Sequence, residues 1–449
     1  MKYFGTDGIR GKANEELTID LAMRTGMALA TVLTEDLGRK PLVLIGRDTR
    51  ISGGMLEAAL TAGLCSSGAN VTSLGVMPTP AVAYLTATEE AADAGIVISA
   101  SHNPFADNGI KIFGGKGYKL TDAQEERIEA YLDQPPATKK TDDALGAVLP
   151  FSGDPIQTYV RHLVDTAPCR LNGMRIAVDC ANGASSATAE ALFQALGADA
   201  VILNHEPDGV NINTHCGSTH IEGLQKFVKN GNFTAGAAFD GDADRCLMVD
   251  ETGEVIDGDH LIGLLACNMK QSGRLKGGAV GTILTNLGLH RFLKENDIPI
   301  LSTQVGDRYV LEKMLEQGWN IGGEQSGHVI LSDFATTGDG ELTALQFLCA
   351  LKADGRKASE LNALIASYPQ VSINVPASNS IKKQVADLPA VKAIGAEITA
   401  FFGGEGRVVI RPSGTEPKVR VMVEGKDPQK VHEKAEYAAA AVKEIIEHL

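Results

Sequence analysis

The sequence has no long hydrophobic stretch. Of its 449 residues 44% are hydrophobic, but no apolar run approaches the roughly 18 residues that a membrane-spanning helix needs. The first residues, MKYFGTD, also lack the apolar core of a secretory signal peptide. We therefore expect a cytoplasmic protein that does not associate with membranes.

Paired cysteines and an excess of positive charge are also absent. The seven cysteines are scattered, and no two of them are spaced as C-x-x-C. This pattern argues against a disulfide framework and against a structural zinc site. The 41 Lys and Arg residues stand against 56 Asp and Glu residues, so the formal net charge is −15. Nucleic acids and anionic membranes are therefore not expected partners, and an anionic substrate would need a local cationic pocket.

What the sequence does contain is a layout that occurs three times: a strand, a glycine-containing polar turn, a helix and a second strand. The first and second strands of the three copies are predicted at 41–45 and 71–74, 174–178 and 200–203, and 278–282 and 298–301. A helical crossover between two neighbouring strands makes those strands parallel. Recurrence at intervals of roughly one hundred residues predicts three related α/β domains with mixed, mainly parallel sheets.

Composition predicts where these units end. Residues 134–154 are rich in Pro, Thr, Lys, Asp and Gly, as is typical of a linker. Residues 371–449 differ from the rest and predict a smaller C-terminal α+β domain with a long final helix at 428–448. We expect four domains, and we place their bounds at 1–150, 151–256, 257–369 and 370–449.

The first candidate site lies in the stretch GIVISASHNPFADNGIK at 95–111. Its apolar start predicts a buried strand, and Pro104 has no amide hydrogen and disfavours helical conformation at Asn103. The strand should therefore end in a fixed, exposed bend that carries Ser101, beyond the carboxyl end of the strand, where sites in parallel α/β domains lie. We predict that Ser101 carries a phosphoryl group during turnover. The alternative is a turn that only ends the strand.

The second candidate site is the string AAFDGDADR, in which Asp240, Asp242 and Asp244 alternate after another apolar strand. In a loop, these carboxylates can converge on one hard cation, and oxygen ligands suit Mg²⁺ or Ca²⁺ better than zinc. An EF-hand is one alternative, because Glu251 stands at its twelfth position, but its glycine position holds Arg245 and strands flank the loop. A solvated acidic turn is another. We predict a Mg²⁺ site, since three carboxylates leave room for phosphate oxygens.

Two further glycine-containing segments carry polar side chains. The string GGEQSGH contains Glu324 and Ser326, which suit sugar hydroxyls, and His328, which can move a proton near neutral pH. The string RPSGTEP and the arginine after it offer backbone amides, hydroxyls and guanidinium groups, which are the parts of a phosphate-binding loop. Its candidate residues are Arg411, Ser413, Gly414, Thr415 and Arg420. Alone, either segment is equally typical of a structural turn.

The serine bend, the three aspartates, GEQSGH and RPSGTEP follow one another as in the phosphohexomutase superfamily, which the whole chain resembles. The resemblance implies four domains around a central cleft, each contributing one loop. It further implies that Ser101 is a phosphoserine whose phosphate binds Mg²⁺ together with the three aspartates. Glu324 and Ser326 would hold the sugar, and the RPSGTEP residues would hold the phosphate of the substrate. One departure is Ser99, where threonine is common.

Three more stretches resemble the branch of this superfamily that interconverts glucosamine 6-phosphate and glucosamine 1-phosphate and so supplies UDP-N-acetylglucosamine for cell-wall precursors. They are FGTDGIRG at 4–11, VNINTHCGSTH at 210–220 and QVGDRYV at 304–310. In the implied reaction, phosphorylated Ser101 donates to O1 or O6 of a small sugar phosphate. The resulting sugar 1,6-bisphosphate reorients, and its other phosphate returns to Ser101. We also expect a homodimer.

Other side chains should assist this transfer. Lys111 and Arg10 are expected to neutralise charge on the phosphoryl oxygens. As the general base we expect first His328, then Lys111 with a lowered pKa, then His102, whose place in the bend also suits a structural role. Retention of a free bisphosphate predicts a closing motion of the C-terminal domain. The alternatives are a phosphatase with Asp240 as nucleophile and a sugar-phosphate sensor without catalysis.

Overall fold

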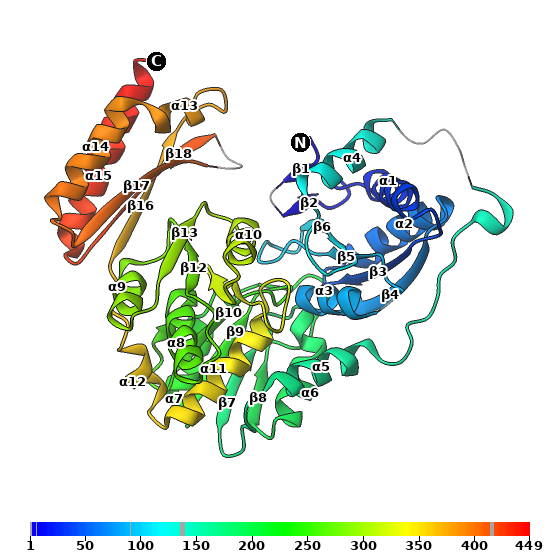
Figure 1. Ribbon diagram of the computed structural model, residues 1–449, viewed down its shortest axis with the longest axis horizontal. Helices are drawn as coiled ribbons and strands as arrows, with labels where there is room; N and C mark the ends of the chain where they lie inside the picture. Colours follow the sequence, from blue (N-terminus) through cyan, green and yellow to red (C-terminus); the bar gives the residue numbers. More distant parts are fainter. Residues whose placement is uncertain (1, 6, 90, 135–139, 414–416) are drawn as a thin grey trace.

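The chain folds around four sheets of six, five, four and three strands (Figure 1). The computed structural model describes residues 2–5, 7–89, 91–134, 140–413 and 417–449, and the four sheets are those of this part. Each sheet lies inside one of the four predicted segments, which we call domains I to IV; their bounds stay a prediction. The predicted fold class, three α/β units followed by a smaller α+β unit, is confirmed.

In domain I the strands β3, β4 and β5 are parallel, as predicted, and β5 is completely buried. The strand β6 then returns antiparallel to β5, so the loop 99–106 joins two neighbouring strands and does not lead into a helix. The sheet order is β1-β2-β6-β5-β3-β4. The elements are β1 (Phe4–Gly5), β2 (Gly8–Lys12), α1 (Ile19–Leu37), β3 (Leu42–Arg47), α2 (Gly53–Ser66), β4 (Asn70–Val76), α3 (Thr79–Thr88), β5 (Ala94–Ile98), β6 (Asp107–Gly114) and α4 (Asp122–Asp133).

Domain II repeats this arrangement with the sheet order β11-β10-β9-β7-β8. Strand β9 is parallel to β7, and β10 is antiparallel to β9. The elements are α5 (Pro155–Thr166), β7 (Arg175–Asp179), the 3₁₀ helix η2 (Ala184–Ala187), α6 (Ala189–Ala195), β8 (Asp199–Leu203), α7 (Glu222–Asn230), β9 (Ala235–Phe239), β10 (Cys246–Asp250) and β11 (Val255–Ile256).

Domain III has the sheet order β13-β12-β14-β15 and the same change of direction, because β14 is parallel to β12 while β15 is antiparallel to β14. In all three domains a predicted motif therefore fills the loop between a central strand and its antiparallel neighbour. The elements are α8 (Gly258–Gln271), β12 (Ala279–Thr282), α9 (Leu287–Glu295), β13 (Ile300–Thr303), α10 (Asp307–Gln317), β14 (Ile321–Gly323), β15 (Val329–Leu331), α11 (Gly340–Asp354) and α12 (Ala358–Asn362).

Domain IV is an antiparallel sheet, β16-β18-β17, packed against helices. Its long final helix agrees with the prediction to within one residue, whereas α13 and α14 were not predicted. Neither α15 nor any other helix of the described residues is long and apolar enough to cross a membrane. The elements are β16 (Gln370–Pro376), α13 (Lys382–Asp387), α14 (Pro389–Phe401), β17 (Gly406–Pro412), β18 (Lys418–Gly425) and α15 (Pro428–Glu447).

The predicted linker 134–154 is not free of structure. It contains the 3₁₀ helix η1 (Asp142–Ala144). Its second half lies along the edge of domain I, where Val71 N–H donates to Ala147 O at 2.9 Å and Leu149 N–H donates to Val71 O at 2.8 Å. Residues 147–149 of this segment therefore lie alongside the edge strand β4 and pair with it at one position.

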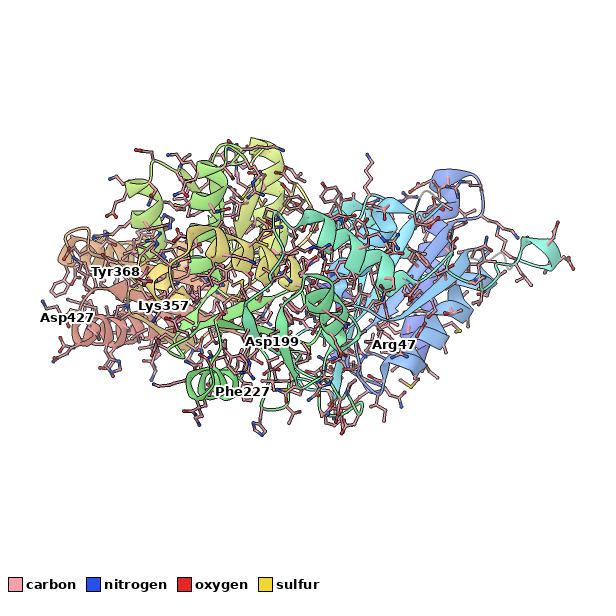
Figure 2. The ribbon with its side chains drawn as sticks, turned by 90° about the horizontal axis from the view of Figure 1, so that it is seen from below. Arg47, Asp199, Phe227, Lys357, Tyr368 and Asp427 are labelled. Carbon is pink, nitrogen blue, oxygen red and sulfur yellow. The ribbon has the colours of Figure 1, made fainter. Side chains whose placement is uncertain are left out.

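Domain IV is joined to one side of domain III. The fully buried Glu424 carboxylate accepts from Leu287 N–H at 2.8 Å and from Arg407 Nε at 2.6 Å. Within domain III, just before β16 begins, the Asn286 side chain donates to Tyr368 O and accepts from Tyr368 N–H, both at 3.0 Å, and so holds the connection to domain IV. Figure 2 shows Tyr368 toward the end of the molecule that lies opposite domain I. These bonds gather around the start of α9, which makes that helix the attachment point of domain IV.

We expect Arg407→Met to loosen domain IV. The variant keeps an apolar stem but leaves the buried Glu424 carboxylate without its guanidinium partner. Loss of one member of a buried ion pair costs roughly 3–5 kcal/mol, and partial exposure of Arg407 places the expected loss near 3 kcal/mol. Urea unfolding and proteolysis near residues 365–372 measure the effect. Arg356→Met breaks an exposed pair with Asp354 and should change stability by less than about 0.5 kcal/mol; equal behaviour of the two variants would refute the expectation.

Candidate active site

The structure brings Ser101 against the aspartate loop of domain II. Ser101 Oγ donates to Asp240 Oδ2 at 2.6 Å, although 139 residues separate them in the chain. The bend was predicted to be exposed, and Pro104 and Phe105 are exposed. Ser101 itself is only 1% exposed, which corrects the prediction. The reason is that the aspartate loop covers it, a contact between two domains.

The backbone of Ser101 is held in the left-handed region, with φ +53°. Such a conformation costs a non-glycine residue on the order of 1–3 kcal/mol, and it persists only where the surroundings enforce it. Arg50, which is fully buried and paired with Asp48 at 2.8 Å, enforces it here. Its guanidinium donates to the carbonyl oxygens of Ser101, Asn103, Pro104 and Asp107.

Two more side chains hold the same loop. Ser99 Oγ donates to Asp48 Oδ2 at 2.6 Å and accepts from Ser101 N–H at 2.9 Å. Threonine carries the same hydroxyl, so the departure at this position keeps the contact. From domain II, Asn213 Nδ2 donates to Ser101 O at 2.9 Å. Neither Arg50 nor Asn213 was predicted as a site residue, because nothing in their local sequence indicates which distant carbonyl groups they reach.

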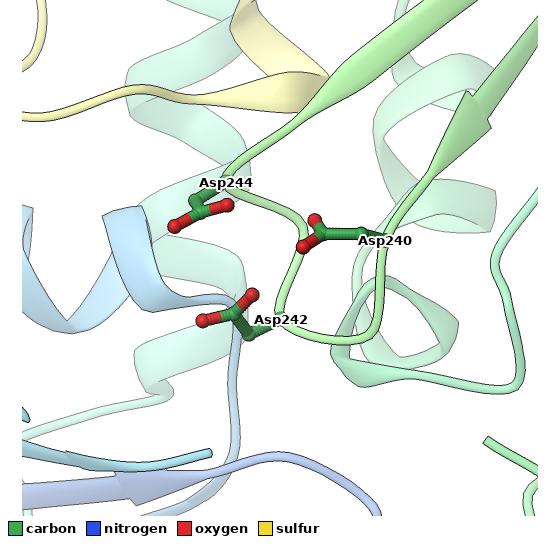
Figure 3. A group of neighbouring side chains, drawn as sticks. All are labelled: Asp240, Asp242 and Asp244. Atoms are coloured by element: carbon green, nitrogen blue, oxygen red, sulfur yellow. The ribbon is translucent and has the colours of Figure 1, made fainter. Parts of the chain in front are cut away.

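Asp240, Asp242 and Asp244 converge as predicted (Figure 3). Each offers one carboxylate oxygen, and the three oxygens lie within 4.8 Å of one another. The loop curls because Ala243 takes φ +57°. It also lies very close to the serine loop, since a Cβ added to Gly241 would come within 2.5 Å of the Ser101 carbonyl oxygen. The glycine therefore allows the two loops to touch.

The two alternatives for this loop are wrong. An EF-hand needs a helix on either side, but antiparallel strands, β9 and β10, flank the loop. Glu251, which would be the twelfth-position ligand, instead accepts from Ser359 N–H at 3.0 Å. A solvated turn is excluded because the three aspartates are at most 6% exposed.

The donor set fits Mg²⁺. Asp242 Oδ1 and Asp244 Oδ1 are buried and have no hydrogen-bond partner among the described residues. Burial first, and then the like charges of Asp244 and Asp242, raise the pKa of Asp240 well above its ordinary value. Oxygen atoms alone, with room for a phosphate, are the ligands of a Mg²⁺ site. Binding of the metal stays a prediction.

Lys111 extends from β6 into this group of carboxylates. Its Nζ lies 2.8 Å from Asp242, 3.1 Å from Asp7 and 3.5 Å from Asp244. Burial alone would lower the pKa of Lys111, but the three carboxylates outweigh it and the pKa lies well above its usual value. The prediction that Lys111 has a lowered pKa and could act as a base is therefore wrong, and the residue is a cation. Arg10 also pairs with Asp7.

His328 is buried next to Asp244. Its Nε2 accepts from Gly338 N–H at 3.1 Å, and its Nδ1 lies 3.7 Å from Asp244 Oδ2. Burial lowers the pKa of His328, but Asp244 and Asp307 raise it more, so the net shift is upward. One nitrogen is thus already used by the backbone, and the other faces a carboxylate.

His102 lies beside the predicted phosphoserine. Its Nδ1 is 3.3 Å from Ser101 Oγ and accepts from Arg245 Nη1 at 3.2 Å. Burial, Arg245 and Arg10 together lower the pKa of His102 to about 4. The imidazole is therefore neutral at pH 7.

The loop between β14 and β15 carries a carboxylate whose charge acts on arginines of both domain II and domain IV. Glu324 Oε1 accepts from Gly306 N–H at 3.0 Å, and Ser326 in the same loop is exposed. The Glu324 carboxylate acts to raise the pKa of Arg245 of domain II and that of Arg411 of domain IV. Glu324 therefore lies in electrostatic reach of both domains.

Arg411 and Arg420 stand opposite each other on β17 and β18. Burial and then Arg420 lower the pKa of Arg411, although Glu324 opposes them. Two neighbouring guanidinium groups can together donate to the oxygens of one phosphate. Ser413 is buried in the same hairpin. Gly414 and Thr415, the other two predicted members, lie outside the described residues.

Four family descriptions match the chain in order. They are the alpha/beta/alpha domains I, II and III of phosphoglucomutase/phosphomannomutase, at 1–139, 157–253 and 257–368, and the C-terminal domain, at 373–441. The chain belongs to the phosphoglucomutase/phosphomannomutase family. The resemblance that the motifs indicated is thus confirmed.

Curated relatives within the phosphoglucomutase/phosphomannomutase family are similar over almost their full length. A phosphoglucosamine mutase of Acetivibrio thermocellus is 50% identical over 437 residues, which is 97% of either chain. A phosphoglucosamine mutase of Streptococcus gordonii is 46% identical over 448 residues, which is 99% of this chain and 98% of that protein.

Solved structures of the phosphoglucomutase/phosphomannomutase family and of related mutases share the fold. A family protein from Burkholderia thailandensis has a TM-score of 0.82 at 24% identity, covering 98% of this chain and 97% of its own. The N-acetylphosphoglucosamine mutase of Aspergillus fumigatus, in complex with GlcNAc-6P and magnesium, has a TM-score of 0.72 at 17% identity, covering 99% and 96%. At these identities the likeness concerns the fold alone.

We expect Arg50→Lys to impair phosphorylation of Ser101. A lysine cannot donate to four carbonyl oxygens at once, so the serine loop should relax from its strained conformation. A displacement of about 1 Å at a reacting group can cost on the order of 10²-fold in rate. The rate of Ser101 phosphorylation by a sugar 1,6-bisphosphate, followed by intact-protein mass, measures the loss. Arg47→Lys is the control, because Arg47 is the last residue of β3, three residues before Arg50, and pairs with Glu57. If Ser101 is phosphorylated as fast in Arg50→Lys as in Arg47→Lys, Arg50 is dispensable for this step.

Proposed function

We propose that this enzyme interconverts glucosamine 6-phosphate and glucosamine 1-phosphate through a phosphoserine at Ser101 and a sugar 1,6-bisphosphate. The observation that carries the proposal is the 2.6 Å contact of Ser101 Oγ with Asp240 inside the aspartate triplet. Preference for an amino sugar is supported by relatives of 46–50% identity named phosphoglucosamine mutase. The product supplies UDP-N-acetylglucosamine synthesis for cell-wall precursors.

Each predicted group has a role in this reaction. The Ser101 Oγ–phosphorus bond breaks as the phosphorus bonds O1 or O6 of the sugar, and the reverse step returns the other phosphate to Ser101. Mg²⁺, held by Asp240, Asp242, Asp244 and the serine phosphate, would withdraw charge from the phosphoryl oxygens. Lys111 offers a permanent cation to the same oxygens, and Arg10 beside it supplies another.

The proton of the sugar hydroxyl needs an acceptor, and we assign this role to His102 in place of His328. The His102 imidazole is neutral, and its Nδ1, which also accepts from Arg245 Nη1, lies 3.3 Å from Ser101 Oγ. His328 has no hydrogen bond with Ser101 among the described residues, and Lys111 is protonated. A pKa of about 4 makes His102 a weak base. When the transition state of phosphoryl transfer is loose, a weak base suffices, because positioning and charge stabilisation account for most of the rate enhancement.

The non-reacting end of the substrate is held by domains III and IV. Glu324 and Ser326 would bind sugar hydroxyls, and Arg411, Ser413, Gly414, Thr415 and Arg420 would bind the phosphate that is not being transferred. The partner is thus a small sugar phosphate, and the sugar 1,6-bisphosphate also activates the enzyme by phosphorylating Ser101. A homodimer and a cytoplasmic location stay predictions.

Phosphorus NMR with Mg²⁺ and glucosamine 6-phosphate tests the function. We expect the 6-phosphate resonance to be replaced in part by that of the anomeric phosphate, faster than with glucose or mannose 6-phosphate. Ser101→Ala should lower the rate on the order of 10³-fold or more, because it removes the phosphoryl carrier.

The two alternatives give different results in that experiment. A phosphatase with Asp240 as nucleophile releases inorganic phosphate and leaves Ser101→Ala active. A sensor gives no turnover, and Ser101 is unmodified in freshly purified protein. Either result would replace the mutase proposal.

Arg411→Met should weaken substrate binding and leave the phosphoserine intact. We expect KM for the sugar phosphate to rise about tenfold or more, because loss of a charge-assisted contact costs roughly 1.5–3 kcal/mol. The phosphorylated fraction of Ser101, measured by intact mass, should not change. Lys426→Met is the control, since Lys426 follows the far end of β18 and pairs with the exposed Glu405. Loss of the phosphoserine in Arg411→Met would show that domain IV does more than hold the substrate.

A further inference from the structure

A closed circuit of alternating basic and acidic side chains lies beside the proposed reaction centre and joins three domains. We call it the charge ring. Its successive nitrogen–oxygen distances are 3.1, 2.5, 2.6, 3.6, 3.7 and 3.5 Å. Its members, in order, are Lys111, Asp7, Lys119, Asp307, His328 and Asp244, which closes the ring on Lys111.

Lys119 is the member that joins domain I to domain III. Its Nζ donates to Asp7 Oδ1 at 2.5 Å and to Asp307 Oδ2 at 2.6 Å. Burial lowers the pKa of Lys119, but Asp307 and Asp7 raise it more, so the side chain is a cation. Its backbone is fixed, because residue 119 pairs with Phe113 in an isolated bridge after β6.

The partner in domain III is equally well fixed. Asp307 is the first residue of α10, where the helix dipole favours a carboxylate. Next to it, Arg308 Nη1 donates to Asp122 of domain I at 2.5 Å, a second bond between the two domains. Just before it, Gly306 N–H holds Glu324. The motif QVGDRYV, which marked the amino-sugar branch in the sequence, therefore forms the domain III side of a bridge to domain I.

We propose that Lys119 is a positioning residue for the mutase reaction: by holding Asp7 and Asp307 together, it fixes Lys111 and His328 around the aspartate triplet. Lys119 has no hydrogen bond or ion pair with Ser101 or with the three aspartates among the contacts of the described residues. Its effect passes through Asp7 to Lys111, at 3.1 Å, and through Asp307 to His328, at 3.6 Å. The inference rests on the proposed function, because it assigns a role within that reaction.

The physical reason is that a catalytic centre loses rate when its charged groups are not held in place. Without the Lys119 ammonium group, Asp7 and Asp307 would face each other across two domains with no cation between them. Each carboxylate would then turn toward Lys111, His328 or water, and the cation of Lys111 would leave the place where phosphoryl charge develops. Electrostatic stabilisation of a transition state depends on groups that are already in place.

Lys119→Met and Lys119→Arg test the proposal, with Lys276→Met as a matched control. Lys276 forms an ion pair of the same 2.6 Å length with Asp333, exposed and within domain III. We measure kcat and KM for glucosamine 6-phosphate, melting temperature, and single-turnover transfer from phosphorylated Ser101. We expect Lys119→Met to lower kcat and the single-turnover rate roughly 30- to 100-fold while KM changes less than about threefold. Lys119→Arg should recover part of the loss, and Lys276→Met should match the wild type.

Asp307→Asn gives an independent test that does not depend on the folding of Lys119→Met. It leaves Lys119 paired with Asp7, so its loss of kcat should be smaller. The double variant should be no slower than Lys119→Met alone, because both act on one path.

Several results would overturn the inference. Wild-type kcat in Lys119→Met, fully additive losses in the double variant, or a fall in kcat that only follows a fall in melting temperature would each do so. The wild type measured in parallel separates the two proposals. An inactive wild type overturns the proposed function and this inference with it, whereas an active wild type with an equally active Lys119→Met variant overturns this inference alone.

Discussion

The burial of three carboxylates within 4.8 Å of one another is the constraint on which the rest of the site depends. In a low-dielectric interior, repulsion between such charges is several kcal/mol unless cations share the space. The aspartate loop of domain II brings Arg245, and Lys111 of domain I adds a second positive charge. His328 of domain III lies beside Asp244, with its Nδ1 3.7 Å from Asp244 Oδ2. Two carboxylate oxygens still have no partner among the described residues, which leaves a place for a metal ion. The site therefore cannot be assembled within one domain, and its charge balance also holds the domains together.

One structural device places these groups. In domains I, II and III a buried central strand is followed directly by an antiparallel strand, and the connecting loop carries the functional side chains. A loop of this kind is anchored by ladder hydrogen bonds at both ends, so a strained residue within it can be held. Ser101, with φ +53°, is such a residue. The common architecture thus supplies the loop, and its conformation is held by Arg50 within domain I and by Asn213 of domain II.

The parts of the site that could be predicted are those whose functional side chains stand close together in the sequence. Pro104 and the apolar strand before it predicted the serine bend, and the alternating aspartates predicted the metal loop. The supports could not be predicted in this way, because Arg50, Asn213 and Lys119 act on residues that are distant in the chain. For the same reason the bases could not be ranked from the sequence: the environment of Lys111 raises its pKa, contrary to the prediction, and the choice between His328 and His102 stays a proposal. Composition separated domain IV from the rest but missed α13 and α14.

The distribution of contacts has a consequence for how a bisphosphate can turn around without leaving. Asn213 and the charge ring tie domains I, II and III to one another beside Ser101, and Arg50 holds the serine loop within domain I. Domain IV is instead attached around the start of α9, where Glu424 accepts from Leu287 N–H. Reorientation requires that the non-reacting phosphate be released and bound again while the serine end keeps its geometry. A reaction centre held by contacts among three domains, with domain IV attached at one place, would satisfy both demands, whereas a uniformly rigid molecule would satisfy only the second.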